Sequence, residues 1–578
     1  MENKEGYLYA LSMQDKFPFT DCPLNEYPRP FFKRDSYICL NGLWDFQMKK
    51  DEDLPLSYSE KILVPYAVES HLSGIERLVK EDDVLFYHRV ITLPDDYVDK
   101  NIIINFDGID QIGKIYIDRK LVLITDDPYL RHQLFVKKAK KEFDLVIQVR
   151  DYTDNSYYQR GKQTTKRNGY FYTSSSGIYR PVWIEKVPDK YIKEISIRPL
   201  FDEKKIKVLV KSDCEGKVKV RIDEKNFFIQ ANKEEYLPVE NFHPYFLETP
   251  YIYDIKFSFY EDEVSSLFAM IKTSIENKGG YKRFAINNKI TFLSGILYQG
   301  YYYLGNLTPL SNDDMYQDLK KIKDMGFNMI RVHVKIEADL FYYYAIRLGL
   351  YIFQDFPNGG ERYSFLPTVL PRVFPFLSNE RVCSFFYKGL GRKSTVSKEI
   401  FQRDAINYLS HLSNVPNIVS YSIFNEGWGE FHPSYIYLKL KEMYPDILFD
   451  TSSGWYDCKS DYYSIHTYTF PRMKREDKTR CFIISEMGGI GYREQMHSLF
   501  KNYFAHKKCK DKITYEKKIK KLYEKDLYFH KRRGLSMIVY TQFNDVEGEY
   551  NGLYTFDRDV LKVDIDLIRK LNNKMINC

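Results

Sequence analysis

The second half of the chain alternates strand-like and helix-like segments, and this alternation limits the fold more than any other feature of the sequence. After Gly279-Gly280, eight runs rich in β-branched and aromatic residues follow one another, with amphipathic segments between several of them. The runs are TFLSGILY, NMIRVHV, LYIFQDF, IVSYSIFNE, ILFDTSS, YYSIHTY, CFIISEM and SMIVYTQFND. Eight such units in roughly 300 residues predict a (β/α)8 TIM barrel, whose active site lies at the carboxyl ends of its strands.

Several intervening segments carry the end signals of helices. DDMYQDLKKIKDMG has Asp313 and Asp314 in its first turn, apolar residues on one face and Gly326 at its end. The segments 339–349 and 398–414 follow the same pattern. The first half of the chain lacks such segments and consists of short strand candidates. We therefore predict a multidomain chain with a β-sandwich at 1–190, an immunoglobulin-like β-sandwich at 191–280 and the barrel at 281–578.

Composition and charge exclude several classes of function. The net charge of +7 is spread along the chain without a concentrated basic face, which argues against a nucleic-acid partner. Eight scattered cysteines without a CxxC pair argue against a disulfide framework or a structural zinc site. The chain shows no signal-peptide core, no run of membrane length and no phosphate-binding glycine loop. We expect a cytoplasmic protein without membrane partner, cofactor or metal; homo-oligomerisation stays open.

Two of the predicted barrel strands end in a glutamate that glycines follow. VSYSIFNEGWGE ends strand four with Asn425 and Glu426, and CFIISEMGG ends strand seven with Glu486, sixty residues further on. Side chains at these ends would face each other across the mouth of the barrel. Hydrolysis of a glycosidic bond by the usual route needs such a pair, one acid/base and one base or nucleophile. The alternative, a glutamate that only caps the following helix, fits the buried run before Glu426 less well.

The chain resembles glycoside hydrolase family 2, the group of β-galactosidases, β-glucuronidases and β-mannosidases. The blocks that carry the resemblance stand in order along nearly the whole chain: YPRPFFKRDSYICLNGLWDFQ, FDGIDQIGKIYID, SSSGIYRPVWIE, ETPYIYDI, MGFNMIRVHV, NVPNIVSYSIFNEGW, FIISEMGG and NGLYTFDRD. The resemblance implies that the first sandwich is a jelly-roll sugar-binding domain. It further implies a retaining double displacement, with Glu426 as acid/base, Glu486 as nucleophile and Asn425 bonding the sugar 2-hydroxyl.

This mechanism sets a condition on Glu426. To act as an acid near neutral pH, Glu426 needs a raised pKa, which apolar walls and the charge of Glu486 would supply. Arg331 at the end of strand two would hold Glu486 ionised and oriented. Other side chains at or just beyond strand ends are candidates for sugar binding, with capping or packing roles as alternatives: His333, Asp355, Trp428, His466, Tyr468 and Asn544.

Two departures from the family bear on the sugar. Where the family's β-galactosidases and β-glucuronidases have an Asp that reaches from the jelly roll, this chain has Phe171, and the Asn-x-Lys of β-glucuronidases is replaced by a stretch that begins with Glu549. A uronic acid would thus meet a carboxylate. We expect a terminal neutral β-glycoside, galactoside first, with β-glucuronide and β-mannoside as alternatives, unless Arg362 or Arg372 in the 360–398 loop reads a carboxylate. A non-catalytic carbohydrate-binding protein is the competing class.

Overall fold

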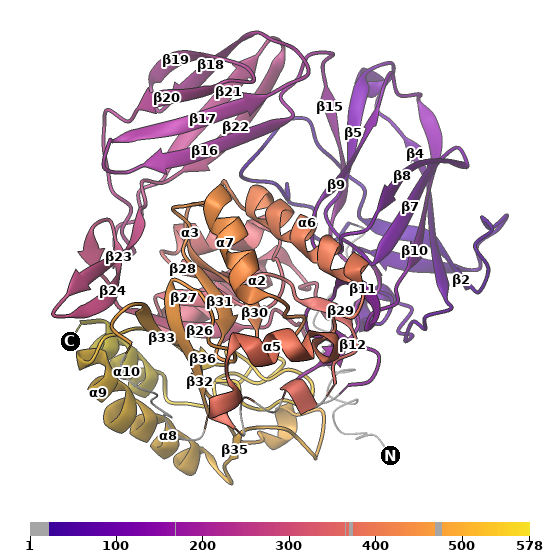
Figure 1. Ribbon diagram of the computed structural model, residues 1–578. Helices are drawn as coiled ribbons and strands as arrows, with labels where there is room; N and C mark the ends of the chain where they lie inside the picture. The colour runs from indigo at the N-terminus through magenta and orange to yellow at the C-terminus, as the bar shows by residue number, and fades with distance from the viewer. Residues whose placement is uncertain are drawn as a thin grey trace.

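The computed structural model describes residues 22–577 except 168, 365, 369–370, 372–373 and 469–476. Arg372 thus lies outside the described residues. The chain forms two β-sandwiches beside a barrel, which lies at the centre of Figure 1 with the last helices at its lower left. Among the described residues, none of the helices has the length and apolar character that crossing a membrane requires.

The first sandwich packs a six-stranded sheet on a four-stranded sheet. The sheet orders are β3-β2-β4-β10-β7-β8 and β1-β15-β5-β9. Alternating side chains of both sheets enclose a core that includes Trp44, Tyr87 and Ile147. The strands are β1 Ile38–Cys39, β2 Gly42–Lys49, β3 Glu60–Val64, β4 Val84–Thr92, β5 Asn101–Phe106, β7 Ile112–Ile117, β8 Lys120–Thr125, β9 His132–Val136, β10 Glu142–Arg150 and β15 Val182–Val187.

The second sandwich has sheets of three and four strands, ordered β16-β17-β20 and β19-β18-β21-β22. Its strands are β16 Glu194–Leu200, β17 Lys205–Lys211, β18 Lys217–Ile222, β19 Lys225–Gln230, β20 Glu234–Pro238, β21 Tyr253–Phe259 and β22 Asp262–Phe268. Strands β19 and β20 bury few side chains and therefore lack a clear alternating pattern in the sequence. Strand β23 (Thr273–Lys278) belongs to a separate three-stranded sheet with β24 Tyr281–Ile286 and β25 Lys289–Ile290.

The barrel consists of eight parallel strands in the order β31-β30-β28-β27-β26-β36-β33-β32, and β31 contacts β32 at the ends of this order. Each of the eight runs picked out in the sequence contains one strand, which confirms the predicted fold class. The strands are β26 Leu293–Tyr298, β27 Met329–Val332, β28 Tyr351–Asp355, β30 Ile418–Asn425, β31 Phe449–Ser453, β32 Tyr462–Thr467, β33 Cys481–Gly488 and β36 Leu535–Thr541.

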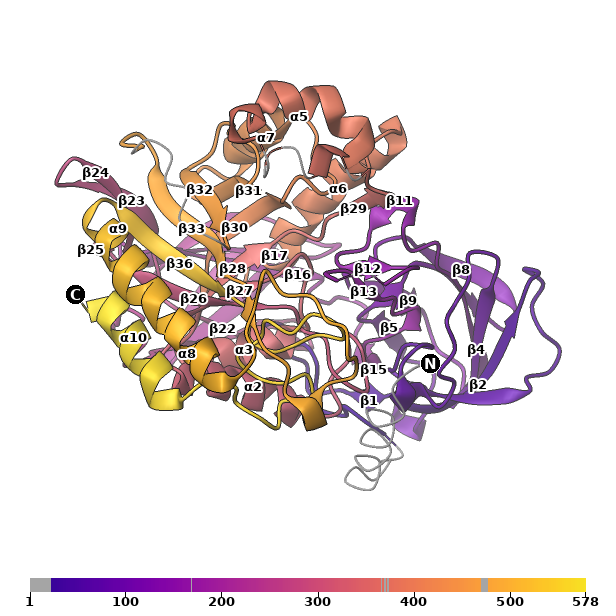
Figure 2. The ribbon, with the colours of Figure 1, turned by 90° about the horizontal axis from the view of Figure 1, so that it is seen from below.

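Helices surround these strands, and Figure 2 shows the C-terminal helices against one side of the barrel. The three predicted helices are present as α2 Asn312–Asp324, α3 Asp339–Arg347 and α6 Thr395–His411. Further α-helices among the described residues are α5 Glu380–Phe386, α7 Pro433–Met443, α8 Lys512–Lys521, α9 Tyr528–Arg532 and α10 Ile565–Asn577, and a π-helical turn at Leu522–Leu527 joins α8 to α9. Ser311 caps α2 through a capping box with Asp314, so the start predicted at residue 313 is close to the observed one.

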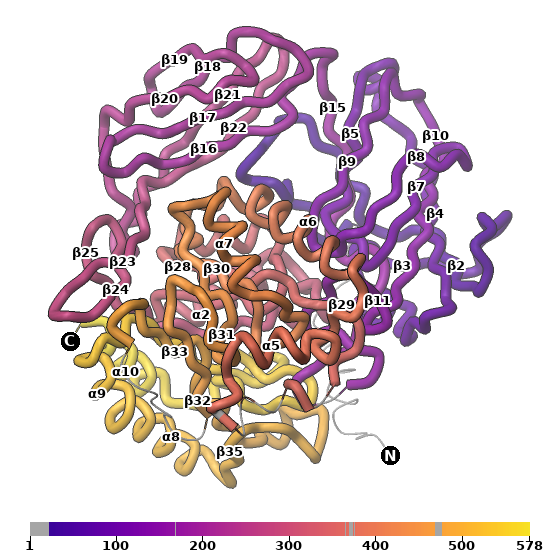
Figure 3. Tube along the Cα trace, in the orientation of Figure 1, coloured from indigo at the N-terminus to yellow at the C-terminus, as the bar shows by residue number. Residues whose placement is uncertain are grey.

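The first sandwich is joined to the barrel by a short shared sheet. Strand β11 (Asn155–Gln159) pairs antiparallel with β29 (Gly359–Glu361), and the two lie side by side in the trace of Figure 3. The side chain of Gln159 donates to Asp404 at 3.2 Å and accepts from Arg392 at 2.9 Å. This junction holds the following loop, 160–176 (described except for residue 168), over the mouth of the barrel. The domain boundaries at 190 and 280 stay a prediction; the second falls at the turn between β23 and β24.

Candidate active site

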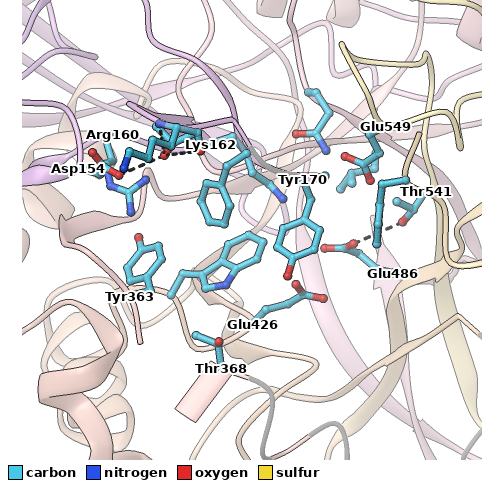
Figure 4. A pocket seen from close by; sticks show the side chains of 18 of the residues that line it. Asp154, Arg160, Lys162, Tyr170, Tyr363, Thr368, Glu426, Glu486, Thr541 and Glu549 are labelled. Carbon is cyan, nitrogen blue, oxygen red and sulfur yellow. Dashed lines mark hydrogen bonds between the residues drawn. The ribbon is translucent and has the colours of Figure 1, made fainter. Parts of the chain in front are cut away.

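A pocket of about 580 Å³ lies at the carboxyl ends of the barrel strands. Glu426 and Glu486 line it together with Trp428 and Tyr468, and the loop 160–176 of the first sandwich forms the opposite wall. In Figure 4 the side chains of Glu426, Glu486 and Glu549 gather toward one end of the pocket, away from Asp154 and Arg160. The two glutamates predicted from strand ends therefore share one cavity.

Glu486 is held in its ionised form by its neighbours. Its Oε1 accepts from Arg331 Nη1 at 3.3 Å and its Oε2 accepts from the Tyr468 hydroxyl at 2.5 Å. Burial alone would raise the pKa of Glu486, but the electrostatic effect of neighbouring side chains, among them His466 and the guanidinium of Arg331, outweighs burial and holds the pKa below its usual value. An ionised, oriented carboxylate is what a nucleophile requires.

Arg331 connects several predicted site residues from a fully buried position. Its Nε donates to Asp355 at 2.9 Å and its Nη2 donates to Asn425 Oδ1 at 2.9 Å, in addition to the contact with Glu486. This fixes the amide of Asn425, whose buried Nδ2 has no hydrogen-bond partner among the described residues. A donor in this state costs free energy unless a ligand satisfies it, and a sugar hydroxyl has the right chemistry.

Glu426 follows the last residue of β30 in a left-handed backbone conformation, with φ of 50°. Gly427 and Gly429 continue the turn at φ of 79° and 65°, values that residues other than glycine rarely adopt. The two glycines therefore let the chain leave the strand while Glu426 stays in the pocket. This explains the NEGWG pattern physically.

The environment of Glu426 contradicts the expected raised pKa. His466 Nδ1 lies 2.8 Å from Glu426 Oε1. Burial would raise the pKa, but the hydrogen bond and the positive charge of His466, with a further contribution from Lys162, lower it from 4.5 to about 2. The expectation considered only apolar walls and the charge of Glu486, because the sequence could not reveal the contact with His466.

Tyr468 bridges the two carboxyl groups. Its hydroxyl lies 2.5 Å from Glu486 Oε2 and 3.3 Å from Glu426 Oε1, and carboxylate oxygens of the two glutamates approach within 4.8 Å of each other. His466 shares this cluster, and the hydrogen bonds among these side chains account for their proximity, so we assign none of them as a metal ligand. The one other group of described residues with metal-ligand spacing, His497, Asp557 and Asp559, does not line the pocket.

Some predicted sugar-binding residues lie behind the pocket wall. His333 and Asp355 bond each other at 2.9 Å beneath Arg331, and both are buried. His466 lies behind Glu426, and the buried Asn544 donates to the carbonyl of Asp545. Trp428 and Tyr468 do line the cavity, and Trp428 is packed rather than exposed, with Phe171 at a ring distance of 5.0 Å.

The sequence reading missed Lys162, which reaches the pocket from the first sandwich. Its Nζ lies 4.1 Å from the ring centre of Trp428 and forms no ion pair within 4.0 Å with a carboxylate of the described residues. Glu549 faces the same space and is held by the Tyr172 hydroxyl and by Asn551 Nδ2. The pocket therefore holds a cation that the sequence analysis did not consider, together with Arg362, which it did. No local signal in the sequence places this loop over the barrel.

The fold and the site together define the class: a barrel with two facing carboxylates suited to glycosidic chemistry, attached to two β-sandwiches. No family model matches the chain. The chain is nevertheless similar to enzymes of glycoside hydrolase family 2, as predicted. It is 22% identical over 323 residues to a β-galactosidase of Halalkalibacterium halodurans (51% of this chain, 30% of that protein). It is 21% identical over 360 residues to a β-glucuronidase of Streptococcus agalactiae (58% and 59%).

Solved structures show the same fold over nearly the whole chain. A β-glucuronidase from an uncultured Clostridium species matches with a TM-score of 0.71 at 16% identity, covering 94% of this chain and 99% of that one. A family 2 β-galacturonidase from Eisenbergiella tayi bound to galacturonate matches with a TM-score of 0.69 at 15% identity, covering 95% and 99%. The chain spans less than a third of the length of the first curated β-galactosidases it matches.

Proposed function

We propose that the protein is a retaining β-glycosidase that releases a terminal sugar, with Glu486 as nucleophile and Glu426 as acid/base. The main observation in support of this proposal is that carboxylate oxygens of the two glutamates lie within 4.8 Å of each other. Retaining enzymes hold the two carboxyl groups about 5 to 5.5 Å apart, whereas inverting enzymes need about 6.5 to 9.5 Å to admit a water molecule. The short approach supports the retaining route.

The reaction has two steps. Glu486 attacks the anomeric carbon while Glu426 protonates the departing oxygen, which leaves a glycosyl ester on Glu486. A water molecule then gives a proton to Glu426 and cleaves the ester. The free Nδ2 of Asn425 would bond the sugar 2-hydroxyl most strongly in the transition state, where charge develops on the ring. The non-catalytic alternative gives no reason for this assembly of two carboxylates, a bridging tyrosine and a buried arginine.

Two sugar classes compete for the pocket. Phe171 and Glu549 favour a neutral β-glycoside as substrate, with a galactoside as the first choice, because a uronate would lie near the carboxylate of Glu549. Lys162 favours a β-uronide as substrate, because its ammonium group lacks an ion pair among the described residues and lies over the ring of Trp428. The names of the relatives include both classes.

A panel of chromogenic β-glycosides tests the function and separates the classes. Hydrolysis of at least one glycoside, abolished in Glu486→Gln, is the expected result; no turnover of any member would contradict the proposal. Lys162→Met should reduce kcat/KM for a uronide at least tenfold more than for a galactoside if Lys162 reads a carboxylate. An equal loss of kcat/KM on the uronide and the galactoside would instead indicate that Lys162 contacts sugar hydroxyls in a site for neutral sugars.

A further inference from the structure

Arg160 lines the pocket but has no carboxylate partner. Its side chain is 3% exposed, and it forms no ion pair within 4.0 Å with a carboxylate of the described residues. A buried charge is ordinarily paired, because its removal from water costs free energy that an opposite charge offsets. In Figure 4 Arg160 lies at the end of the pocket away from Glu486 and Glu549. The proposed reaction gives this buried cation no role.

Most of the donor capacity of Arg160 is unused. Its Nη1 donates to the carbonyl of Gln163 at 2.5 Å, whereas Nε and Nη2 have no hydrogen-bond partner among the described residues. Nε and Nη2 form one edge of the guanidinium, which can donate two parallel hydrogen bonds to a carboxylate. Elsewhere in the chain Arg34 uses this edge in that way, with Nε and Nη2 each 3.0 Å from a carboxylate oxygen of Asp262. Arg160 thus offers the donor half of a bidentate carboxylate contact.

The surrounding structure holds Arg160 in place. Its backbone N–H donates to the carbonyl of Asn358 at 3.1 Å, next to the pairing of β11 with β29. Its guanidinium carbon lies 4.6 Å from the ring centre of Tyr363 and 5.5 Å from that of Phe171. Contacts between a cation and an aromatic face stabilise the guanidinium without neutralising its charge. The group is therefore oriented and still able to pair with an anion.

The charged groups at this end of the pocket do not cancel one another. Asp154, the acid at this end, pairs with Arg362 Nε at 3.6 Å and accepts hydrogen bonds from two threonine hydroxyls. Arg160 is left as a second guanidinium beside a single carboxylate. The three glutamates of the pocket lie toward the other end. The pocket is thus polarised, with an acidic end where the reaction occurs and a basic end beyond it.

Aromatic rings connect the two ends. Trp428 follows Glu426 by two residues, and its ring centre lies 5.0 Å from that of Phe171, whose ring contacts the guanidinium of Arg160. In the proposed reaction Glu426 protonates the departing oxygen, so the departing group lies beside Glu426. Aromatic pocket walls of this kind suit a sugar or aromatic ring. A departing ring that packs along Trp428 and Phe171 would direct its far substituent toward Arg160.

We propose that the basic end of the pocket binds a carboxylate on the departing group, and that Arg160 recognises this carboxylate through Nε and Nη2. The substrate class is then a β-glycoside whose departing ring, from a sugar acid or an aromatic acid, bears a carboxylate beyond the scissile bond. This inference rests on the proposed function. It specifies the departing half of the substrate and is independent of which sugar occupies the acidic end.

The test uses two pairs of probes that differ in the carboxylate. One pair is a 3-carboxyphenyl and a 3-carbamoylphenyl β-glycoside; the other is a disaccharide with glucuronic acid or glucose as the departing unit. Each pair is made on galactose and on glucuronic acid. In the wild type, kcat/KM for the acid should exceed that for its neutral partner by about tenfold or more in at least one pair, because hydrogen bonds to charged groups are strong. The pair with the larger ratio distinguishes an aromatic acid from a sugar acid.

Variants of Arg160 test the assignment through this ratio. Arg160→Met should bring the ratio to within about threefold of one, and Arg160→Lys, which keeps the charge but loses the planar edge, should give an intermediate ratio. Because both probes are measured on the same protein, the ratio does not depend on the fraction that is folded. Arg569→Met is the matched control: it removes the same charge from α10, where Arg569 pairs with Asp566 outside the pocket lining, and should leave the ratio unchanged.

Three outcomes would overturn the proposal. The first is a ratio of about one for every pair in the wild type, and the second is an unchanged ratio in Arg160→Met. The third is a ratio that falls in Lys162→Met and not in Arg160→Met. Lys162 is the other buried pocket cation without an ion pair among the described residues, so this result would assign the carboxylate to Lys162.

Binding without turnover separates this inference from the proposed function. In Glu486→Gln, calorimetry should give the acid of at least one pair a Kd about tenfold lower than that of its neutral partner, and the added Arg160→Met should remove the difference. Equal affinities would refute the carboxylate site even in an active enzyme. Absence of turnover on every glycoside in the wild type would refute the proposed function, while the affinities would remain measurable.

Discussion

Tyr468→Phe removes one oxygen from the centre of the site and keeps the ring, which stacks on His506 at a ring distance of 3.7 Å. The lost hydroxyl donates to Glu486 at 2.5 Å. A hydrogen bond to a charged group contributes about 1.5–3 kcal/mol. Its benefit is largest when Glu486 regains its full charge, as the sugar leaves the ester in the second step. We therefore expect this step to slow about 10- to 150-fold.

The assay is steady-state and pre-steady-state kinetics with an activated aryl glycoside. In Tyr468→Phe, kcat should fall by at least tenfold, with a burst of released phenol, while kcat/KM, which reports the first step, should fall less. The acid limb of kcat/KM should also move to higher pH, because losing the donor raises the pKa of Glu486 and the nucleophile must be ionised.

A pocket tyrosine that touches neither glutamate provides the control. Tyr363 lines the cavity, and its hydroxyl donates to the carbonyl of Gly359 at 3.5 Å. Tyr363→Phe should therefore change kcat by less than about threefold. The reasoning is refuted if both variants lose activity equally, or if Tyr468→Phe leaves kcat and the acid limb where they were.

The other predictions concern single side chains. Glu486→Gln should abolish turnover while thermal melting stays close to wild type, and near-normal activity would remove Glu486 from the role of nucleophile. Glu426→Ala should slow glycosides with poor leaving groups far more than activated ones, with azide restoring the second step; equal losses without azide rescue would contradict its role as acid/base. Arg331→Met should cost about 3–5 kcal/mol in the free energy of unfolding, because it leaves Asp355 and Glu486 buried without their cation, and a denaturant titration showing under 1 kcal/mol would contradict this.

The barrel was predictable because its signals are local. Each strand is a short apolar run, and the strand-terminal Glu426 and Glu486 are marked by the glycines that follow them. Strands β19 and β20 carry no such signal, because an exposed strand with few buried residues has no clear alternation. A local sequence pattern thus identifies a strand or helix when one side of it is buried. It gives little information about an element that is mostly exposed.

The rest of the site depends on contacts between distant segments. Lys162 reaches the pocket only because β11 pairs with β29, some 200 residues away, and neither strand signals its partner in the sequence. The pKa of Glu426 was predicted with the wrong sign because it depends on a 2.8 Å contact with His466, forty residues further along. Neither pairing across the fold nor an interatomic distance can be obtained from residue spacing.

The central claim is that a covalent glycosyl ester forms on Glu486. Its most direct test is peptide mass spectrometry after inactivation with an activated 2-deoxy-2-fluoro β-glycoside of the best sugar in the panel, since the fluorine slows both steps and the good leaving group restores the first. We predict one added sugar per chain, located on Glu486, and its absence from Glu486→Gln. An unlabelled chain that still hydrolyses the parent glycoside, or a sugar attached to another carboxylate, would contradict the claim.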